Sequence, residues 1–595
     1  MKRKTQFSRK HLLVVLIVVG MVLAGMYAFA PKNKTPQEED KEQVGFVKTL
    51  AINAAKPVFR EVKLVLTDII GNNLDGARDR IASTHDTIKS VRRTVKGTTF
   101  VTGSDSQAGK KLGKILKLLD AADMALMEIA LPATDLLEEY PISELKVGDG
   151  FSTKLIGRYL DFAESVMPKV ETVMQNANSV DLKELDTDGE VTEYLELANK
   201  VMDIYHEEES IFSMIRSMIG AEEDRLYVIA VQNSSEVRAS GGFPGSIGTM
   251  RIRDGVLTLG DFQSVTYMLS SYTPRDIQIT GEERALFGYL SGIQTPRDAD
   301  LCPDFERVGH IWASAYEEMN KEPVAGVISM TPHIVKRVLA ATETELELFD
   351  GLVLNGDNAM EVLLHDIYFK YFGKDFVEGR EKISDELFAD AAKKTMKMLA
   401  DHVSITQFIE YVPILKDSVE DRTLMVWMKD ESEQRFITRM GWSGGLNADP
   451  QNPAAGIYYN CIMASKMGWY FRMDTAIGER TKNEDGSYTY PVTVTFTNDA
   501  TEEEMAKAGN YIVGDMNGSI RGAAYFFAPA GGVVSDFDAS NGQKIQIKTY
   551  NDLELGFMDA FILEPNVPIT ICYLVTTAPG VETSLVISRT PTARE

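Results

Sequence analysis

The residues best suited to chemistry lie in one stretch, residues 225–262. A short apolar run from Leu226 to Val231 has the length of a buried strand. The polar, glycine-rich connection that follows carries a carboxylate, a guanidinium and an amide. An arginine beside glycine-rich backbone suits a phosphate or carboxylate, because the guanidinium binds such groups bidentately and glycine permits close approach. The candidate phosphate-binding residues of this loop are Asn233, Glu236, Arg238, Gly241 and Gly242.

A run of carboxylates at residues 298–304, flanked by Arg297 and Arg307, forms a second set of candidates. Clustered carboxylates prefer a hard cation such as Mg²⁺, and such an ion can in turn bridge to a phosphate. We therefore take three of these residues as candidate metal ligands: Asp298, Asp300 and Asp304.

Both sets also have a purely structural interpretation, which the sequence leaves open. In the first set, the Glu236–Arg238 pair only pins a loop between two strands of a hairpin. In the second, the segment leads into a helix, with Asp304 as its N-cap and the other carboxylates favoured by the helix dipole. Under these interpretations neither set binds a ligand.

The elements expected around these residues are strands interleaved with helices, which predict a three-layer α/β domain over residues 224–444. Asp254–Gly255 is a strong signal for a two-residue hairpin turn. The expected strands are 226–231, 247–252, 256–259, 324–330 and 424–428. The expected helices are 306–319, 331–341, 359–371, 383–402 and 404–412.

Different patterns flank this region on both sides. Apolar residues at three- and four-residue steps, as from Leu112 to Ile129, predict a helical bundle over residues 46–220, to which we assign no chemistry. After a linker at 445–455, the period changes to two, as in Tyr488–Thr497, and predicts an antiparallel β-sandwich over 456–595. The fold class is therefore multidomain, with all-α, α/β and all-β parts.

The N-terminal sequence predicts that the protein is located in the cell envelope. Five basic residues and no acidic one lie in residues 1–10, and residues 11–30 are mostly apolar, long enough to span roughly 30 Å of hydrocarbon. The positive-inside rule then predicts a cytoplasmic tail, a single membrane anchor, a polar stalk at 31–45 and an extracellular remainder on a bacterial cell membrane. A cleaved signal peptide is the alternative.

Composition and missing motifs narrow the function further. The formal net charge of -25 argues against a general nucleic-acid binder, which needs a positive surface. The sequence has no P-loop, no HExxH and no GxSxG motif, and His333 and His365 have no second ligand at metal spacing, so whether the protein is an enzyme stays open. Of the three cysteines, Cys461 and Cys572 fall in the same late region and could pair.

Three segments resemble a bacterial family of unknown function, the domain-of-unknown-function family numbered 4012. QNSSEVRASGGFPGSIG resembles its QNxxExRxxGGFxGS signature, and DADLCPDF, residues 298–305, is similar to its DANWSPDF segment. VAGVISMTPHIVKRVLAAT, residues 324–342, resembles its VDGVIxxDPxxLxxLLxxT segment, and the order of segments extends the resemblance over about residues 10–500. Asp300, Leu301 and Cys302 stand where the family usually has Asn, Trp and Ser.

A weaker, fold-level resemblance is to the LytR-CpsA-Psr phosphotransferases, which move glycopolymers from a polyprenyl-pyrophosphate carrier to the cell wall. It implies that Arg238 and Arg275 hold pyrophosphate and that Asp276 or Asp298 helps to place Mg²⁺. His365 and Asp366 depart from that family's second arginine-rich element. The resulting hypothesis is a membrane-anchored envelope protein that binds or transfers a phosphate-linked lipid or cell-wall glycan. The alternatives are a non-catalytic scaffold or polymer-binding protein and a membrane-proximal sensor working through the helical bundle.

Overall fold

The computed structural model describes residues 58, 61–62, 64–65, 67–102, 104, 106–148, 150–178, 211–221, 223–374, 383–401 and 405–594. The cytoplasmic tail, membrane anchor and stalk predicted for residues 1–45 lie outside these residues. Within the described ranges, no helix is both long and apolar enough to cross a membrane. The chain divides into two units, of which the first holds the part up to Glu223 with the short segments Asp254–Val256 and Ala400–Pro413.

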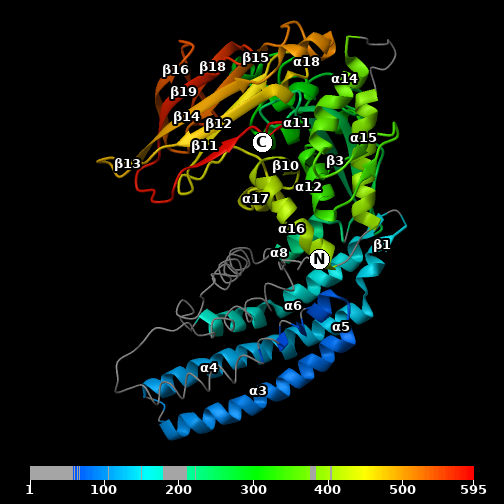
Figure 1. Cartoon of the computed structure of the whole chain (residues 1–595), viewed down its shortest axis with the longest axis vertical. Helices are drawn as coiled ribbons and strands as arrows, with labels where there is room; N and C mark the ends of the chain where they lie inside the picture. Colours follow the sequence, from blue (N-terminus) through cyan, green and yellow to red (C-terminus); the bar gives the residue numbers. More distant parts are fainter. Residues whose placement is uncertain are drawn as a thin grey trace. The chain divides into compact units, whose positions relative to one another are not determined.

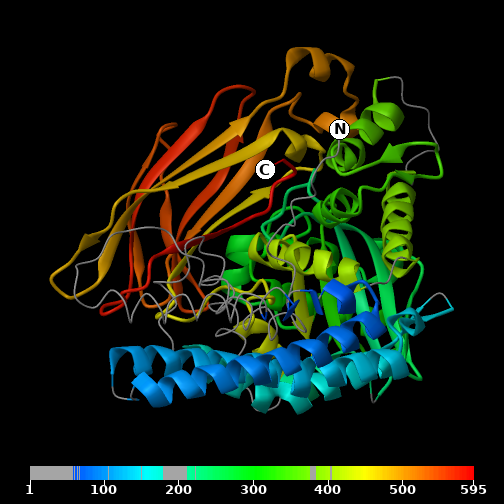
Figure 2. The same cartoon turned by 60° about the horizontal axis from the view of Figure 1, so that its bottom comes forward.

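The first unit is built from long helices that lie alongside one another (Figures 1 and 2). Its apolar face is the predicted one: Leu112, Ile115 and Leu119 are buried. The side chain of Ser106 caps α4 by accepting a hydrogen bond from the Gly109 N–H. The elements are α3 (Leu74–Thr102), α4 (Gln107–Met124), the π-helix η1 (Ala125–Ala130), α5 (Leu131–Glu139), η2 (Ile142–Leu145), β1 (Lys146–Val147), β2 (Gly150–Ser152), α6 (Thr153–Asn178) and α8 (Ile211–Met218).

The second unit contains a mixed sheet in the order β5-β4-β3-β7-β10, with β6 beside β4. The strands are β3 (Arg225–Asn233), β4 (Phe243–Arg253), β5 (Val256–Leu259), β6 (Gln263–Ser264), β7 (Gly326–Met330) and β10 (Leu424–Met428). β3 runs antiparallel to β4 and parallel to β7, and β10 is antiparallel to β7. Asp254 and Gly255 both have positive φ, as the predicted two-residue turn requires.

Helices surround this sheet, and α11 packs against β7 and β10. The helices of this part of the chain are α9 (Val265–Met268), α10 (Gly281–Phe287), η3 (Pro296–Leu301), α11 (Phe305–Asn320), α12 (His333–Thr342), α13 (Ala359–Glu361), η4 (Val362–Asp366), α14 (Ile367–Phe372), α15 (Ile383–Asp401), α16 (Ile405–Glu420) and α17 (Glu431–Arg439). A two-strand ribbon, β8 (Leu346–Glu347) and β9 (Val353–Leu354), lies between α12 and α13 in the sequence.

Two further sheets follow in the same unit. The first has the order β17-β18-β15-β11-β20, and the second has the order β12-β14-β19-β16 with β13 beside β14. Their aromatic rings interdigitate: Phe496 of the second sheet lies 5.6 Å from Tyr459 and 5.8 Å from Phe561 of the first, between ring centroids. The two sheets therefore pack face to face, as the alternating pattern predicts (Figure 1).

The bounds of these elements are β11 (Ala454–Cys461), η5 (Met467–Tyr470), β12 (Phe471–Ile477), β13 (Thr481–Lys482), β14 (Tyr488–Asn498), α18 (Glu502–Lys507), α19 (Asn510–Val513), β15 (Ile520–Phe527), β16 (Val533–Ala539), β17 (Gln546–Tyr550), β18 (Leu553–Leu563), β19 (Ile569–Thr576) and β20 (Val586–Arg589).

The sheet that contains β15 is buried on both faces, which the sequence prediction of a separate β-sandwich domain did not include. Phe526 points into the core between the two sheets, whereas Tyr525 and Phe527 belong to the core of the α/β part. The Tyr525 ring lies 5.5 Å from Phe287 of α10, and its hydroxyl donates to the carbonyl of Leu286 at 2.7 Å. The predicted linker at 445–455 therefore does not separate two independent cores. Side chains of the α/β part and of the β part belong to the same hydrophobic core within one unit.

Candidate functional site

The loop between β3 and β4, residues 234–242, is a buried segment that packs against the end of its own strand. Gly241 has φ +119°, and a Cβ at this position would lie 2.6 Å from Oε1 of Gln232. A Cβ on Gly242 would lie 2.3 Å from the carbonyl oxygen of Asn233. Glycine is therefore required here by the protein's own packing, not by the approach of a ligand.

The side-chain amide of Asn233 is hydrogen-bonded through both its oxygen and its nitrogen. Its Oδ1 accepts from the backbone N–H of Ser235 at 3.0 Å and from the Ser235 hydroxyl at 2.6 Å. Its Nδ2 donates to the hydroxyl of Tyr368 at 2.5 Å. Asn233 thus closes an Asx-type turn and ties the loop to α14.

Glu236 forms an ion pair with Lys466, a lysine that lies 230 positions further along the chain. The ammonium is buried between two tyrosines, 4.8 Å from the ring centroid of Tyr368 and 5.0 Å from that of Tyr511. Burial alone would lower the pKa of Lys466, but the Glu236 carboxylate and the two tyrosines outweigh it and raise that pKa above its ordinary value. Lys466 is therefore a fixed cation at neutral pH.

Arg238 is 3% exposed and forms an ion pair with a carboxylate of the second set. Its Nη2 lies 3.4 Å from Oδ1 of Asp298. The other oxygen of Asp298 accepts from the backbone N–H of Ser291 at 3.2 Å. Nη1 of Arg238 has no hydrogen-bond partner among the described residues. The guanidinium is therefore enclosed, and besides Asp298 it lies over the ring of Phe243, with 5.9 Å between Cζ and the ring centroid.

Asp300 is fully buried, and neither of its carboxylate oxygens has a hydrogen-bond partner in the described part of the chain. Burial raises the pKa of Asp300 well above its usual range, although the positive charge of Arg238 acts in the opposite direction. Burial thus favours the neutral form of the Asp300 carboxyl group, which is held beside Arg238 and Asp298.

The remaining candidates serve the fold. Asp304 is the N-cap of α11 and accepts from the Glu306 N–H at 3.2 Å, and burial raises its pKa to about 6. This is the structural interpretation of Asp304 that the sequence left open. Asp276 is exposed and accepts from the Ser314 hydroxyl at 2.7 Å. Arg275 is also exposed, and its backbone N–H donates to Glu318 at 3.0 Å.

These residues do not fit a Mg²⁺ ion. Asp298 is neutralised by Arg238, burial favours the neutral form of Asp300, and Asp304 is occupied by its helix. Across the described residues, no group of three or more His, Cys, Asp and Glu side chains is arranged to hold a metal ion. A hard dication needs several free oxygen ligands, and this arrangement does not provide them.

Residues 222–368 match the model of a family described as "Protein of unknown function (DUF4012)". This part of the chain is a DUF4012 domain. The match confirms the family prediction and includes all three segments that carry the resemblance, although it is shorter than the expected 10–500. No curated protein and no solved structure matched the chain, and the comparisons give no support to the LytR-CpsA-Psr resemblance.

The DUF4012 domain does not complete its own signature loop. The N–H of Ala239 donates to Oδ1 of Asn460 at 2.8 Å, and the Gly468 N–H donates to the carbonyl of Ser235 at 2.9 Å. The amide of Asn460 in turn donates to the Leu301 carbonyl at 2.8 Å, which joins both candidate sets to β11. The loop is thus a polar junction between the DUF4012 domain and the β part of the same unit.

Sequence reasoning missed the partners that complete this junction, chiefly Asn460 and Lys466. Each is a polar residue inside an otherwise apolar segment, AAGIYYNC and SKMGWY respectively, and a polar residue in such a segment is a signal of buried hydrogen bonding. The suggested pairing of Cys461 with Cys572 is wrong, because both cysteines are free and Cys572 is exposed whereas Cys461 is buried.

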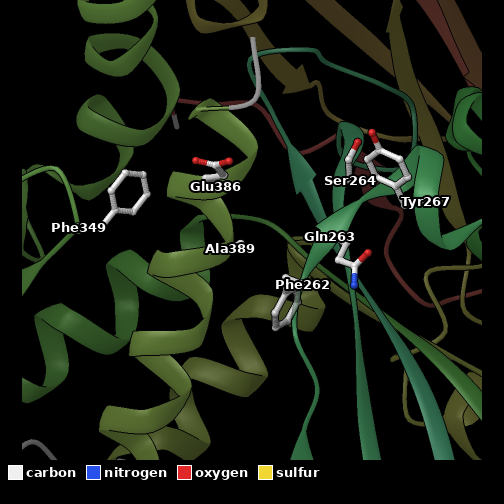
Figure 3. A pocket seen from close by; sticks show the side chains of 7 residues that line it. All are labelled: Phe262, Gln263, Ser264, Tyr267, Phe349, Glu386 and Ala389. Carbon is white, nitrogen blue, oxygen red and sulfur yellow. The ribbon is translucent and has the colours of Figure 1, made fainter. Parts of the chain in front are cut away.

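Two cavities formed by the described residues have no lining residue from the loop 234–242. One is a small apolar cavity beside Val231 and Met330. The other is an open groove between the segment Phe262–Tyr267 and α15 (Figure 3). None of the predicted phosphate or metal ligands lines either of them.

Proposed function

We propose that this protein is a non-catalytic component of the bacterial cell envelope that binds a wall polymer, held at the membrane by residues 11–30. The choice of a non-catalytic role rests on the burial of the signature loop. In this loop Arg238 is 3% exposed, the Asn233 amide is bonded to Tyr368, and Glu236 is paired with Lys466. A phosphate group needs donors that it can reach, and these donors are enclosed by the protein. The loop is therefore better explained as a structural junction than as a catalytic centre.

The envelope address is supported by the N-terminal sequence, with its basic residues 1–10 and the apolar stretch that follows. A single exposed cysteine gives a direct test of topology. Cys572 is exposed, and the two other cysteines are buried. A membrane-impermeant maleimide should label the protein in intact cells but not its Cys572→Ser variant. Labelling only after the membrane is permeabilised would place this part of the chain in the cytoplasm and refute the topology.

Transfer of a polyprenyl-phosphate-linked glycan is the competing function. It is tested by mass spectrometry of lipids that co-purify with the full chain, with Arg238→Ala and with the exposed-site control Arg435→Ala. We expect no polyprenyl phosphate with any of the three, and a lower melting temperature for Arg238→Ala alone. A polyprenyl phosphate bound to the parent and lost in a folded Arg238→Ala variant would overturn the non-catalytic proposal.

Polymer binding is tested by co-sedimentation of the full chain with purified, protein-free bacterial cell walls. We expect the protein in the pellet, and release of the protein by soluble wall fragments. A protein that stays in the supernatant with walls of its own source would refute the binding role.

A further inference from the structure

An open groove of about 490 Å³ lies between the β6–α9 segment and α15, within the size range of ligand sites (Figure 3). Its walls are held by regular structure. On one side β6 pairs with β4 through Gln263 opposite Ile247 and Ser264 opposite Ser246. On the other side the groove is bounded by Phe349 and by α15, which carries Glu386.

Two large aromatic side chains that line this groove are each more than half exposed. Tyr267 is 54% exposed and Phe349 is 53% exposed, and Figure 3 shows them at opposite ends of the groove. Phe262 lies between them at the floor and is partly buried. Exposed aromatic rings that line a concavity mark a binding surface more often than scattered ones do. Their flat faces suit the C–H-rich faces of sugar rings.

Polar groups lie between the two rings. The Gln263 amide offers both donors and acceptors, the Ser264 hydroxyl offers one donor, and the Glu386 carboxylate accepts. Gln263 and Glu386 are exposed. A ligand that combines apolar ring faces with many hydroxyl groups satisfies both parts of this lining, whereas a purely apolar helix satisfies only the aromatic part.

The charge around the groove selects against anions. Among the described residues that line it there is one carboxylate, Glu386, and no lysine or arginine. Two lysines of α15 are paired with carboxylates: Lys393 lies 3.0 Å from Asp261, and Lys394 lies 2.9 Å from Asp390. The Glu386 carboxylate therefore disfavours a phosphate-rich polymer, a nucleic acid or an anionic membrane surface at this lining.

We infer that the groove binds a segment of a neutral polysaccharide, with Tyr267 and Phe349 stacking on sugar rings and the polar residues between them bonding hydroxyl groups. The groove is open to solvent, which suits a polymer segment better than a small enclosed molecule. This inference rests on the proposed polymer-binding function and adds to it the site and the chemical class of the polymer.

The test is calorimetric titration of the full chain, in a detergent without a sugar headgroup, with short oligomers of neutral hexoses and of N-acetylated amino sugars. Tyr267→Ala and Phe349→Ala should each weaken binding about tenfold, the cost of losing one stacked ring. Tyr272→Ala is the matched control, because Tyr272 is 82% exposed and does not line the groove, and its binding should be unchanged.

Each other outcome overturns the inference in a recognisable way. Glycan binding that survives both aromatic substitutions places the site elsewhere and leaves the proposed function intact. Co-sedimentation with cell walls without binding of any neutral oligomer rejects the polymer class but not the function. A lysine-rich peptide that binds the parent and is lost in Glu386→Gln shows that the groove takes a cationic protein segment instead. If neither walls nor oligomers bind, the inference and the proposed function both fail.

Discussion

Replacement of Lys466 by methionine tests whether the signature loop is a structural junction. The substitution keeps most of the side-chain volume but removes the ammonium that pairs with Glu236 and lies between the rings of Tyr368 and Tyr511. The Glu236 carboxylate then stays in a partly buried position without its counter-charge. An isolated charge in such a place destabilises the folded state strongly.

The expected magnitude follows from the burial of the pair. Removing one member of a buried ion pair costs about 3–5 kcal/mol, and two aromatic contacts with a desolvated cation add about 1 kcal/mol or more. Because Glu236 keeps some exposure to solvent, we expect a loss in the lower half of that combined range, about 4 kcal/mol of the free energy of unfolding. Adding Glu236→Gln to Lys466→Met should recover part of the loss, since the double variant carries no unpaired charge.

The assay is urea unfolding followed by tryptophan fluorescence. All four tryptophans lie in the unit that contains the junction, so the signal reports on this unit alone. The matched control is Lys482→Met. Lys482 also pairs with a glutamate, Glu582 at 3.0 Å, and lies over a tyrosine ring, but it is exposed. Exposed pairs add little to stability, so the control should unfold almost as the parent does.

The pH dependence gives a second readout of the same pair. The pKa of Lys466 is raised in the folded state, so its stabilisation is complete below the unfolded value of about 10.4 and is lost only as the pH rises through the higher folded value. The stability difference between parent and variant should therefore stay constant from neutral pH to about pH 10. A loss for Lys466→Met as small as that for Lys482→Met would refute the role of the loop as a junction.

Three further substitutions test the environment of the site. Burial lowers the pKa of His333 to about 4, so the folded state should lose up to about 3 kcal/mol as the pH falls from 6.5 to 4, and His333→Gln should flatten this part of a melting-temperature profile. Burial raises the pKa of Asp300 in the folded state. Its contribution to the free energy of unfolding is therefore complete below pH ~3.9 and is lost as the pH rises through the folded-state pKa. Asp300→Asn should not lower the melting temperature at pH 7 and should remove this loss of stability at higher pH. A clearly lower melting temperature of Asp300→Asn at pH 7 would show that the carboxylate is ionised and paired. Gly242→Ala should lower the free energy of unfolding by about 2 kcal/mol or more, because the added Cβ would lie 2.3 Å from the backbone of Asn233. The control Gly281→Ala, where a Cβ has nothing within 4 Å, should change it by less than about 0.5 kcal/mol. Equal melting temperatures of the two variants in calorimetry would contradict this reasoning.

Local patterns were sufficient to predict most of the elements of the second unit. The strand predicted at 424–428 has those bounds as β10, and the helix predicted at 306–319 is α11, longer by one residue at each end. Strand and helix periodicities are set by residues close in sequence, so a pattern detects them. The failure concerned β15, in which the apolar run GAAYFF, residues 522–527, is typical of a strand buried on both faces. The prediction of a half-solvated sandwich did not use this run.

The candidate site was predicted less well, for a physical reason. The types and proximity of Glu236 and Arg238 suit anion binding, but whether a charge is free for a ligand depends on its neighbours in space. Lys466 and Asn460 come from segments more than 200 positions away, and no spacing rule relates them to the loop. Only the role of Asp304 could be predicted from its neighbours in the sequence, because an aspartate just before a helix has one common structural role, that of the N-cap.

The shared core of the second unit also affects biosynthesis. Glu236 waits for a partner 230 residues later, which at roughly 5–20 residues per second is about ten to fifty seconds of chain elongation. During that interval the loop is incomplete, and the apolar side of α10 lacks β15, whose Tyr525 packs on it. A nascent or truncated chain that ends at the family boundary near residue 368 should therefore expose apolar surface and be prone to aggregation. An expression fragment of the DUF4012 domain should therefore extend to at least residue 590, because the Thr590 hydroxyl donates to the carbonyl of Ala239 at 3.1 Å.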